Sequence, residues 1–229
     1  MSAVRENILR IRERIAAAAL RAGRDPNGVR LMAVTKTVSD EPLLAAIEAG
    51  IDIIGENYVQ EAKRKIELMG KSVEWHLIGH LQTNKAKVAV RLFDMIHSVN
   101  RLSLAEEINR RAAVVGTVCR VLIEVNLGGE ESKSGAPPEE AMVLIRTIAA
   151  MPHLSIRGLM TMAPWYDDPE KARPCFAGLR VLRDRIAAEN IPNVAMQELS
   201  MGMTDDFEVA VEEGATIVRV GRAIFGERH

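Results

Sequence analysis

A lysine that ends an apolar run is the first residue of this sequence to indicate specific chemistry. Residues 30–36 read RLMAVTK, which places Lys36 where a buried strand would end. Such a placement is costly, because burial disfavours the ammonium form of lysine. The alternative is that Lys36 simply leaves the core and extends into water. The polar residues and glycines that follow seven other predicted strands favour a shared site.

Two loops near the end of the chain have the composition of a phosphate-binding site. The stretch SMGMTDD at 200–206 precedes a predicted helix. Ser200 and Gly202 could therefore offer a hydroxyl and closely approaching amides near the positive end of that helix. Gly221 and Arg222 precede a second short helical turn. The alternative is that these glycines only make tight turns.

Arg219 is the third candidate. Strand alternation puts Ile217 and Arg219 on one face of the last strand, and Val218 and Val220 on the other. We expect the valines to face helices and the arginine to point inward. A buried arginine stays charged and needs an acceptor, for which Glu198 is the structural candidate.

Together, a lysine, a phosphate cradle and an inward arginine fit pyridoxal 5′-phosphate. The lysine would form a Schiff base, the two late loops would hold the phosphate, and the arginine would face the pyridine nitrogen. A cation at that position disfavours protonation of the ring nitrogen and weakens the ring as an electron sink. The pattern therefore predicts a site that does not favour deep carbanion chemistry.

The elements that must position these residues alternate between strand and helix. We predict a helix at 3–22 and then strands at 30–35, 51–54, 74–78, 94–97, 118–125, 155–160, 195–199 and 216–220. The helices predicted between the strands span about 40–49, 57–69, 83–92, 101–115, 137–150, 169–189 and 204–213.

Eight such units predict a closed (β/α)₈ TIM barrel with an extra N-terminal helix, as one domain over residues 1–229. An open doubly wound sheet is the alternative, but no G-x-G-x-x-G follows the first strand. In a barrel the site lies at the carboxyl ends of the strands, and the loops after strands seven and eight often bind phosphate.

Composition excludes several other classes. The net charge of −1 gives no bulk attraction to nucleic acid or to an acidic membrane, and no apolar run approaches the length of a membrane span. The N-terminus lacks an apolar signal region, and the two cysteines have no metal or redox spacing, so we expect a reduced cytoplasmic protein.

Two further groups of residues have side chains that could bind a metal or an anion. His76 and His80 have the spacing of a zinc pair, but a strand and Gly79 intervene and no third ligand is evident, so we expect no metal. We interpret Lys133 and the lysines and arginine at 63–65 as solvated charges. A contact between Lys133 and the cofactor is the alternative.

The chain resembles the pyridoxal phosphate homeostasis proteins, which are similar to the barrel domain of alanine racemases (fold type III). The resemblance runs through essentially the whole chain. It includes LMAVTK, IGENYVQEAKRK, WHLIGHLQTNK, IHSVN, VNLGGEESKSG, GLMTMAP and LSMGMTDDFEVAVEEGATIVRVGRAIFG.

This resemblance implies that Lys36 forms the Schiff base and that Arg219 faces the pyridine nitrogen. It places Ser200, Gly202, Gly221 and Arg222 on phosphate-binding positions, and Asn57 and His80 in the pocket. Many relatives carry Thr where this chain has Arg222, so a guanidinium could replace a hydroxyl contact.

The resemblance also implies a protein that carries or buffers the cofactor and maintains vitamin B6 and amino-acid balance, without turnover. We expect a monomer that makes transient contact with enzymes dependent on pyridoxal phosphate. A minimal amino-acid racemase is the alternative. It would need acid/base groups on both faces of the substrate carbon, and only Lys36 is an evident candidate. A third possibility is a phosphate-binding barrel without pyridoxal.

Overall fold

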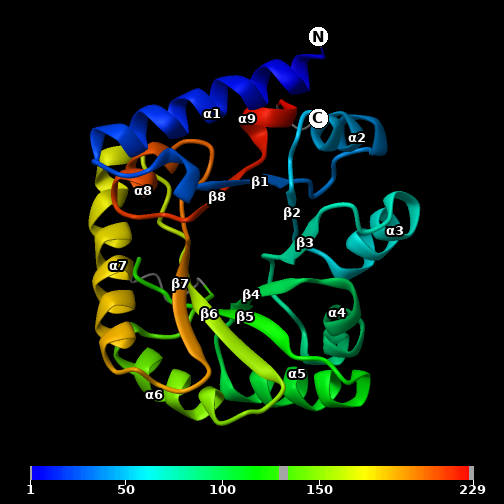
Figure 1. Ribbon diagram of the computed structural model, residues 1–229, viewed down its shortest axis with the longest axis vertical. Coiled ribbons are helices and arrows are strands. Elements are labelled where there is room, and N and C mark those ends of the chain that lie inside the picture. Colours follow the sequence, from blue (N-terminus) through cyan, green and yellow to red (C-terminus); the bar gives the residue numbers. More distant parts are fainter. Residues whose placement is uncertain (1, 129–133, 227–229) are drawn as a thin grey trace.

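The computed structural model describes residues 2–128 and 134–226, and these form a closed barrel of eight parallel strands arranged in chain order (Figure 1). The first strand pairs with both the second and the last, which closes the barrel. The strands are β1 Arg30–Val34, β2 Ile53–Glu56, β3 Glu74–Leu77, β4 Met95–Val99, β5 Cys119–Glu124, β6 Leu154–Met160, β7 Val194–Ser200 and β8 Ile217–Val220.

Helices surround the barrel and connect its strands (Figure 1). They are α1 Ala3–Arg21, α2 Asp40–Glu48, α3 Val59–Met69, α4 Ala86–Leu92, α5 Leu102–Val115, α6 Pro138–Ala149, α7 Arg173–Ala188, α8 Phe207–Glu212 and α9 Arg222–Phe225. Short 3₁₀ turns lie at Pro26–Gly28, Thr83–Lys85 and Pro169–Ala172. The predicted (β/α)₈ barrel is confirmed.

Several predicted element boundaries were wrong, and two of these differences have a clear physical reason. The strand predicted at 51–54 begins at Ile53, because the N–H of Ile51 still donates to the carbonyl of Ala46 at 3.1 Å and closes helix α2. The helix predicted from 204 begins only at Phe207. Asp206 accepts the N–H of Met203 through its side chain at 2.6 Å, which folds the preceding residues into a turn.

Helix α1 is the predicted extra N-terminal helix, and it packs against α8, α9 and α2 (Figure 1). Its apolar face carries Ile8, Ile11 and Ile15, all buried. Asn7 donates to the carbonyl of Ile224 at 3.0 Å. The helix therefore joins the beginning of the described chain to its last elements.

The apolar core has two layers. The larger layer lies between the strands and the helices. The barrel interior holds two small clusters, one of Met32, Ile53 and Ile217 and one of Met95, Leu122 and Met160. Buried polar side chains, among them His76, His97, Ser200 and Arg219, also point into the barrel and are hydrogen-bonded to one another.

In the two described ranges, 2–128 and 134–226, no helix has the length and apolar character needed to cross a bilayer.

Candidate functional site

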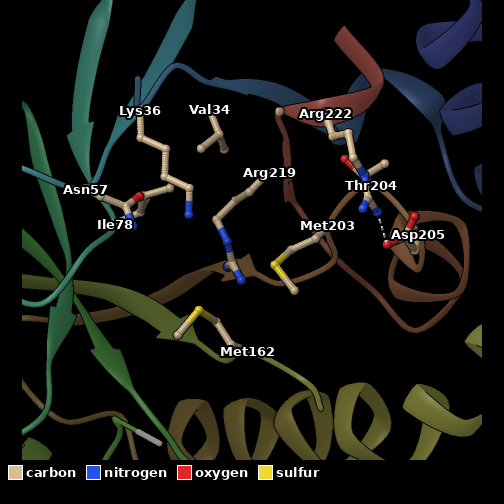
Figure 2. Close-up of a pocket in the computed structure, with 11 residues that line it drawn as sticks. Val34, Lys36, Asn57, Ile78, Met162, Met203, Thr204, Asp205, Arg219 and Arg222 are labelled. Carbon is tan, nitrogen blue, oxygen red and sulfur yellow. Dashed lines mark hydrogen bonds and ion pairs between the residues drawn. The ribbon is translucent and has the colours of Figure 1, made fainter. Parts of the chain in front are cut away.

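A cavity of about 410 Å³ opens among the loops that follow the barrel strands, and Figure 2 shows the side chains of Lys36 and Arg219 extending into it. Five of the eight residues predicted for the site line this cavity: Lys36, Asn57, Arg219, Gly221 and Arg222. The other lining residues are Val34, Ile78, Met162, Met203, Thr204 and Asp205. Lysine, asparagine and two arginines thus come together from strands β1, β2 and β8 and their loops.

The remaining three predicted residues, all within the described part of the chain, do not line this cavity. His80 is exposed beyond the end of β3. Ser200 is fully buried, and its hydroxyl lies 3.0 Å from Nδ1 of His97 inside the barrel. The hydroxyl that the sequence offered to a phosphate is bonded to His97 and Arg219 instead, because Ser200 is the last residue of β7 and its side chain points into the barrel. A phosphate contact through the Ser200 backbone stays a prediction.

Gly202 has a structural reason for being glycine. Its φ angle is +89°, and a Cβ atom there would lie 2.5 Å from Cβ of Ala210. The residue therefore allows the loop after β7 to pass closely over helix α8. This packing accounts for the glycine without excluding an amide contact to a ligand.

Arg219 points into the barrel as predicted, and only 4% of it is exposed. Its guanidinium donates to the carbonyl of Ser200 at 2.6 Å, to the Ser200 hydroxyl at 2.8 Å and to the carbonyl of Thr161 at 2.8 Å. Burial lowers the pKa of Arg219 to about 10, and the carboxylates of Asp206 and Glu124 oppose that shift. The arginine is therefore cationic at neutral pH.

The suggested partner of Arg219 was wrong. The carboxylate of Glu198 accepts instead from the hydroxyl of Thr216. Among the described residues, the acceptors of Arg219 are two backbone carbonyls and a hydroxyl, so no carboxylate in that part of the chain bonds directly to the cation.

Behind Lys36 lies a hydrogen-bonded set of residues that we call the buried ion cluster: the fully buried Thr35, Glu56 and Lys65, and the partly exposed Glu61. Lys65 is fully buried, so its interpretation as a solvated charge was wrong. Its Nζ lies 2.7 Å from Oε1 of both Glu56 and Glu61 and 2.5 Å from the carbonyl of Thr35. Burial raises the pKa of Glu56, and the hydrogen bonds from Lys65 and Thr35 oppose that rise.

The buried ion cluster fixes the backbone on both sides of Lys36. Thr35 precedes it and accepts from Lys65 through its carbonyl. Thr37 follows it with φ +61°, and its N–H donates to Glu61 at 2.7 Å. Since a threonine rarely adopts a positive φ, these bonds stabilise an uncommon backbone turn at the lysine. The sequence signal was available, because Lys65 shares a helix face with Ala62 and Ile66.

Asn57 reaches the cavity because glycine stands beside it. A Cβ atom on Gly79 would lie 2.4 Å from the carbonyl oxygen of Asn57. The carbonyl of Gly79 accepts from Ser98 at 2.7 Å, which holds this loop in place. The glycine after β3 therefore permits the close approach that sets Asn57 at the rim.

On the other side of the cavity, Arg222 and Asp205 form an ion pair, drawn as a dashed line in Figure 2. Both side chains are about half exposed, at 48% and 45%. Asp205 and the adjacent Thr204 were missed as lining residues. The sequence predicted a helix from 204, which would have placed both residues in its first turn and not in a loop beside the cavity. Lys133, the other lysine considered for a ligand contact, lies outside the described residues.

Glu124 is a buried carboxyl group near Arg219 that the sequence did not single out. It is 2% exposed and accepts from Asn100 at 3.2 Å. Burial raises its pKa to about 7, while Arg219 and Asn100 oppose the rise. Three cationic side chains, Lys36, Arg219 and Arg222, line the cavity and can bind an anionic ligand. Lys36 can also present an amine to an electrophilic carbonyl.

Comparison with known proteins gives concordant results. The family model "Alanine racemase, N-terminal domain" matches residues 1–229. The pyridoxal phosphate homeostasis protein of Aquifex aeolicus is 47% identical over 224 residues, covering 97% of each chain.

Two solved structures are similar over nearly the whole chain. An unknown protein from Bifidobacterium adolescentis is 41% identical, with a TM-score of 0.94, and the match covers 97% of this chain and 94% of that one. PipY of Synechococcus elongatus PCC7942, in its structure with PLP bound, is 36% identical with a TM-score of 0.82. That match covers 94% of this chain and 100% of PipY.

Proposed function

The chain belongs to the family of pyridoxal phosphate homeostasis proteins, and from this premise we propose that it holds pyridoxal 5′-phosphate as a Schiff base on Lys36. In this proposal the protein carries or buffers the cofactor, maintains vitamin B6 and amino-acid balance, and turns over no substrate of its own. The PLP-bound structure of the similar protein PipY supports the choice of ligand.

The observation that carries the proposal is that Lys36 and Arg219 line one cavity. The cofactor supplies an aldehyde for the lysine amine and an aromatic ring whose nitrogen needs a polar partner. Arg219 is cationic and is held by three hydrogen bonds to neutral acceptors. Its positive charge is therefore available to face the ring nitrogen. A fixed cation there disfavours protonation of the ring nitrogen.

The phosphate is assigned to the loops after β7 and β8. Gly221 and Arg222 line the cavity at the start of α9, where the first amides of a helix have no partner within the helix. Thr204 adds a hydroxyl on the same side. Ser200 and Gly202 stay predictions as backbone donors, and His80 stays a prediction as a pocket residue.

The absence of turnover is proposed from the titratable groups of the cavity. The described lining residues that titrate are Lys36, Asp205, Arg219 and Arg222. Asp205 is paired with Arg222, and arginine keeps its proton at neutral pH. Racemisation needs a second acid/base group facing the lysine across the substrate, and this set does not offer one.

A visible absorption spectrum with added pyridoxal phosphate tests the proposal. We expect a Schiff-base band that borohydride reduction removes, with the reduced adduct mapped to the peptide that contains Lys36. Lys36→Ala should abolish the band. Lys63→Ala is the matched control, since Lys63 is an exposed lysine in a surface pair with Glu67 and should leave the band unchanged.

Three outcomes would contradict parts of the proposal. An adduct on scattered lysines would reject Lys36 as the site. Protein that stays colourless with added cofactor would favour the phosphate-binding barrel without pyridoxal. Conversion of an L-amino acid to its D-form that disappears in Lys36→Ala would establish the racemase alternative.

A further inference from the structure

A line of hydrogen bonds crosses the inside of the barrel and ends on Arg219. We call it the interior chain: Glu74, His76, His97, Ser200 and Arg219. Oε2 of Glu74 lies 2.9 Å from Nε2 of His76, and Nδ1 of His76 lies 3.0 Å from Nε2 of His97. Nδ1 of His97 lies 3.0 Å from the Ser200 hydroxyl, which accepts from Arg219 at 2.8 Å.

The interior chain links opposite ends of the barrel. Glu74 is the first residue of β3, at the amino ends of the parallel strands, whereas Ser200 is the last residue of β7, at the carboxyl ends. His76, His97 and Ser200 have essentially no exposed surface. No water competes for their hydrogen bonds, so each donor and acceptor in the line must match its neighbour.

The hydrogen atoms of the interior chain have one consistent arrangement. An ionised carboxylate only accepts, so Nε2 of His76 must carry a hydrogen and donate to Glu74. A neutral His76 then has a bare Nδ1, which accepts from Nε2–H of His97. The bare Nδ1 of His97 in turn accepts from the Ser200 hydroxyl, whose oxygen accepts from Arg219. Every bond therefore points from the arginine toward the carboxylate.

The charge states that this arrangement needs agree with the surroundings of each group. The hydrogen bond from His76 lowers the pKa of Glu74 to about 2. Burial lowers the pKa of His76 and lowers that of His97 well below its ordinary value, and Arg219 adds to the effect on His97. The other charged groups near the Glu74 end are Arg30, 3.4 Å from its Oε2, and Arg120.

We propose that Glu74 is a positioning residue for Arg219, acting across the barrel by fixing the hydrogen-bond direction of His76, His97 and Ser200. Because the Glu74 carboxylate fixes the direction of the bonds, the Ser200 hydroxyl donates its hydrogen to His97. The lone pairs of the Ser200 oxygen are then available to accept from the Arg219 guanidinium. The carboxylate also makes His97 an acceptor on its Ser200 side, so that no second cation forms beside Arg219. Glu74 touches neither the cavity nor Arg219, and no sequence motif of the predicted site includes it.

The role of Glu74 toward a ligand rests on the proposed function, whereas the direction of the interior chain does not. Long-range ¹H–¹⁵N correlation spectra of histidine-labelled protein read that direction. We expect His76 and His97 as neutral Nε2–H tautomers. His153 serves as an internal reference for the other tautomer, Nδ1–H. Its Nδ1 lies 3.2 Å from the carbonyl oxygen of Thr117, which can only accept, so Nδ1 must carry the hydrogen.

Glu74→Gln then tests the positioning role. The introduced amide has nearly the same shape but can donate as well as accept, so the chain loses its fixed direction. We expect His97, which Glu74 does not touch, to gain an Nδ1–H population. We also expect the dissociation constant for pyridoxal phosphate to rise about 5-fold, as loss of one buried hydrogen bond implies.

Arg30→Gln is the control, because it removes the ion pair at Glu74 but leaves the interior chain intact. It should change neither the His97 tautomer nor the affinity. A wild-type His97 found as Nδ1–H or as imidazolium overturns the proposal even if no variant can be prepared. So does Glu74→Gln with an unchanged His97 spectrum or an unchanged dissociation constant. Wild-type protein that binds no pyridoxal phosphate would reject the proposed function, and the tautomers would still report on the chain.

Discussion

Lys36 and Arg219, two of the three cations that line the cavity, are supported by different kinds of groups. Arg219 is fixed through its own guanidinium, by hydrogen bonds to two carbonyls and a hydroxyl inside the barrel. The contacts described around Lys36 act on its neighbours, since the buried ion cluster binds Thr35 and Thr37. Under the proposed function this difference is instructive. The residue proposed to form a covalent bond has its adjacent backbone fixed by buried charges, and the cation proposed only to face the ligand has its guanidinium fixed by neutral acceptors.

The two supports also differ in charge. The buried ion cluster holds a fully buried lysine against two glutamates, and Oε2 of Glu56 has no hydrogen-bond partner among the described residues. Between its charged ends the interior chain consists of neutral groups that satisfy one another. A buried ion is costly when its partner is lost. We therefore expect substitutions in the buried ion cluster to lower the free energy of unfolding more than substitutions in the interior chain.

Lys65→Met should have the largest effect on stability. It leaves Glu56 buried without its cation, and breaking a buried ion pair in this way costs about 3–5 kcal/mol. Urea unfolding measures the loss. Lys63→Met is the control, because Lys63 is exposed and its pair with Glu67 contributes about 0.5 kcal/mol or less. Equal losses in both variants would show that the buried ion cluster does not stabilise the fold.

The buried carboxyl group of Glu124, near Arg219, should make the stability of the fold depend on pH. Its folded pKa of about 7 lies above the ordinary value of 4.5, so the folded state favours the protonated form. That stabilising contribution is complete below about pH 4.5 and is lost as pH rises through 7, by about 3 kcal/mol in total. The free energy of unfolding of Glu124→Gln should lack this decline. Parallel pH profiles for the two proteins would contradict the prediction.

Gly202→Ala tests how tightly the loop between β7 and β8 packs against helix α8. The new Cβ would meet Ala210 and require a positive φ, whereas Gly23→Ala requires a positive φ in open space. We expect Gly202→Ala to cost about 2 kcal/mol more than Gly23→Ala in thermal or urea unfolding. A similar cost at both positions would mean that the loop relaxes away from α8.

Arg222→Thr should have the smallest effect on stability. Its exposed pair with Asp205 is worth about 0.5 kcal/mol at most. If the guanidinium contacts the phosphate, the dissociation constant for pyridoxal phosphate should nevertheless rise about 10-fold, as expected for one charged hydrogen bond. Titration of the absorption band measures this. An unchanged affinity would leave the phosphate to the backbone amides and Thr204.

The sequence by itself determined the features that depend on neighbouring residues. The alternation of strands and helices specified a (β/α)₈ barrel, because parallel strands need crossover helices. The two-residue period of β8 determined that Arg219 points inward and Val218 outward, since side chains alternate across a strand. The same local order put Lys36 at the end of β1, at the rim of the cavity.

Only the tertiary structure decided which distant groups meet. The helix face of Lys65 indicates that the lysine can be buried, but only the packing of α3 against β2 places its ammonium beside Glu56. Ser200 follows the strand predicted at 195–199 and was therefore expected to be a loop donor, yet barrel closure brings its hydroxyl to His97, 103 residues away in sequence. Such contacts depend on the stagger of strands around the closed barrel, which no short stretch of sequence encodes.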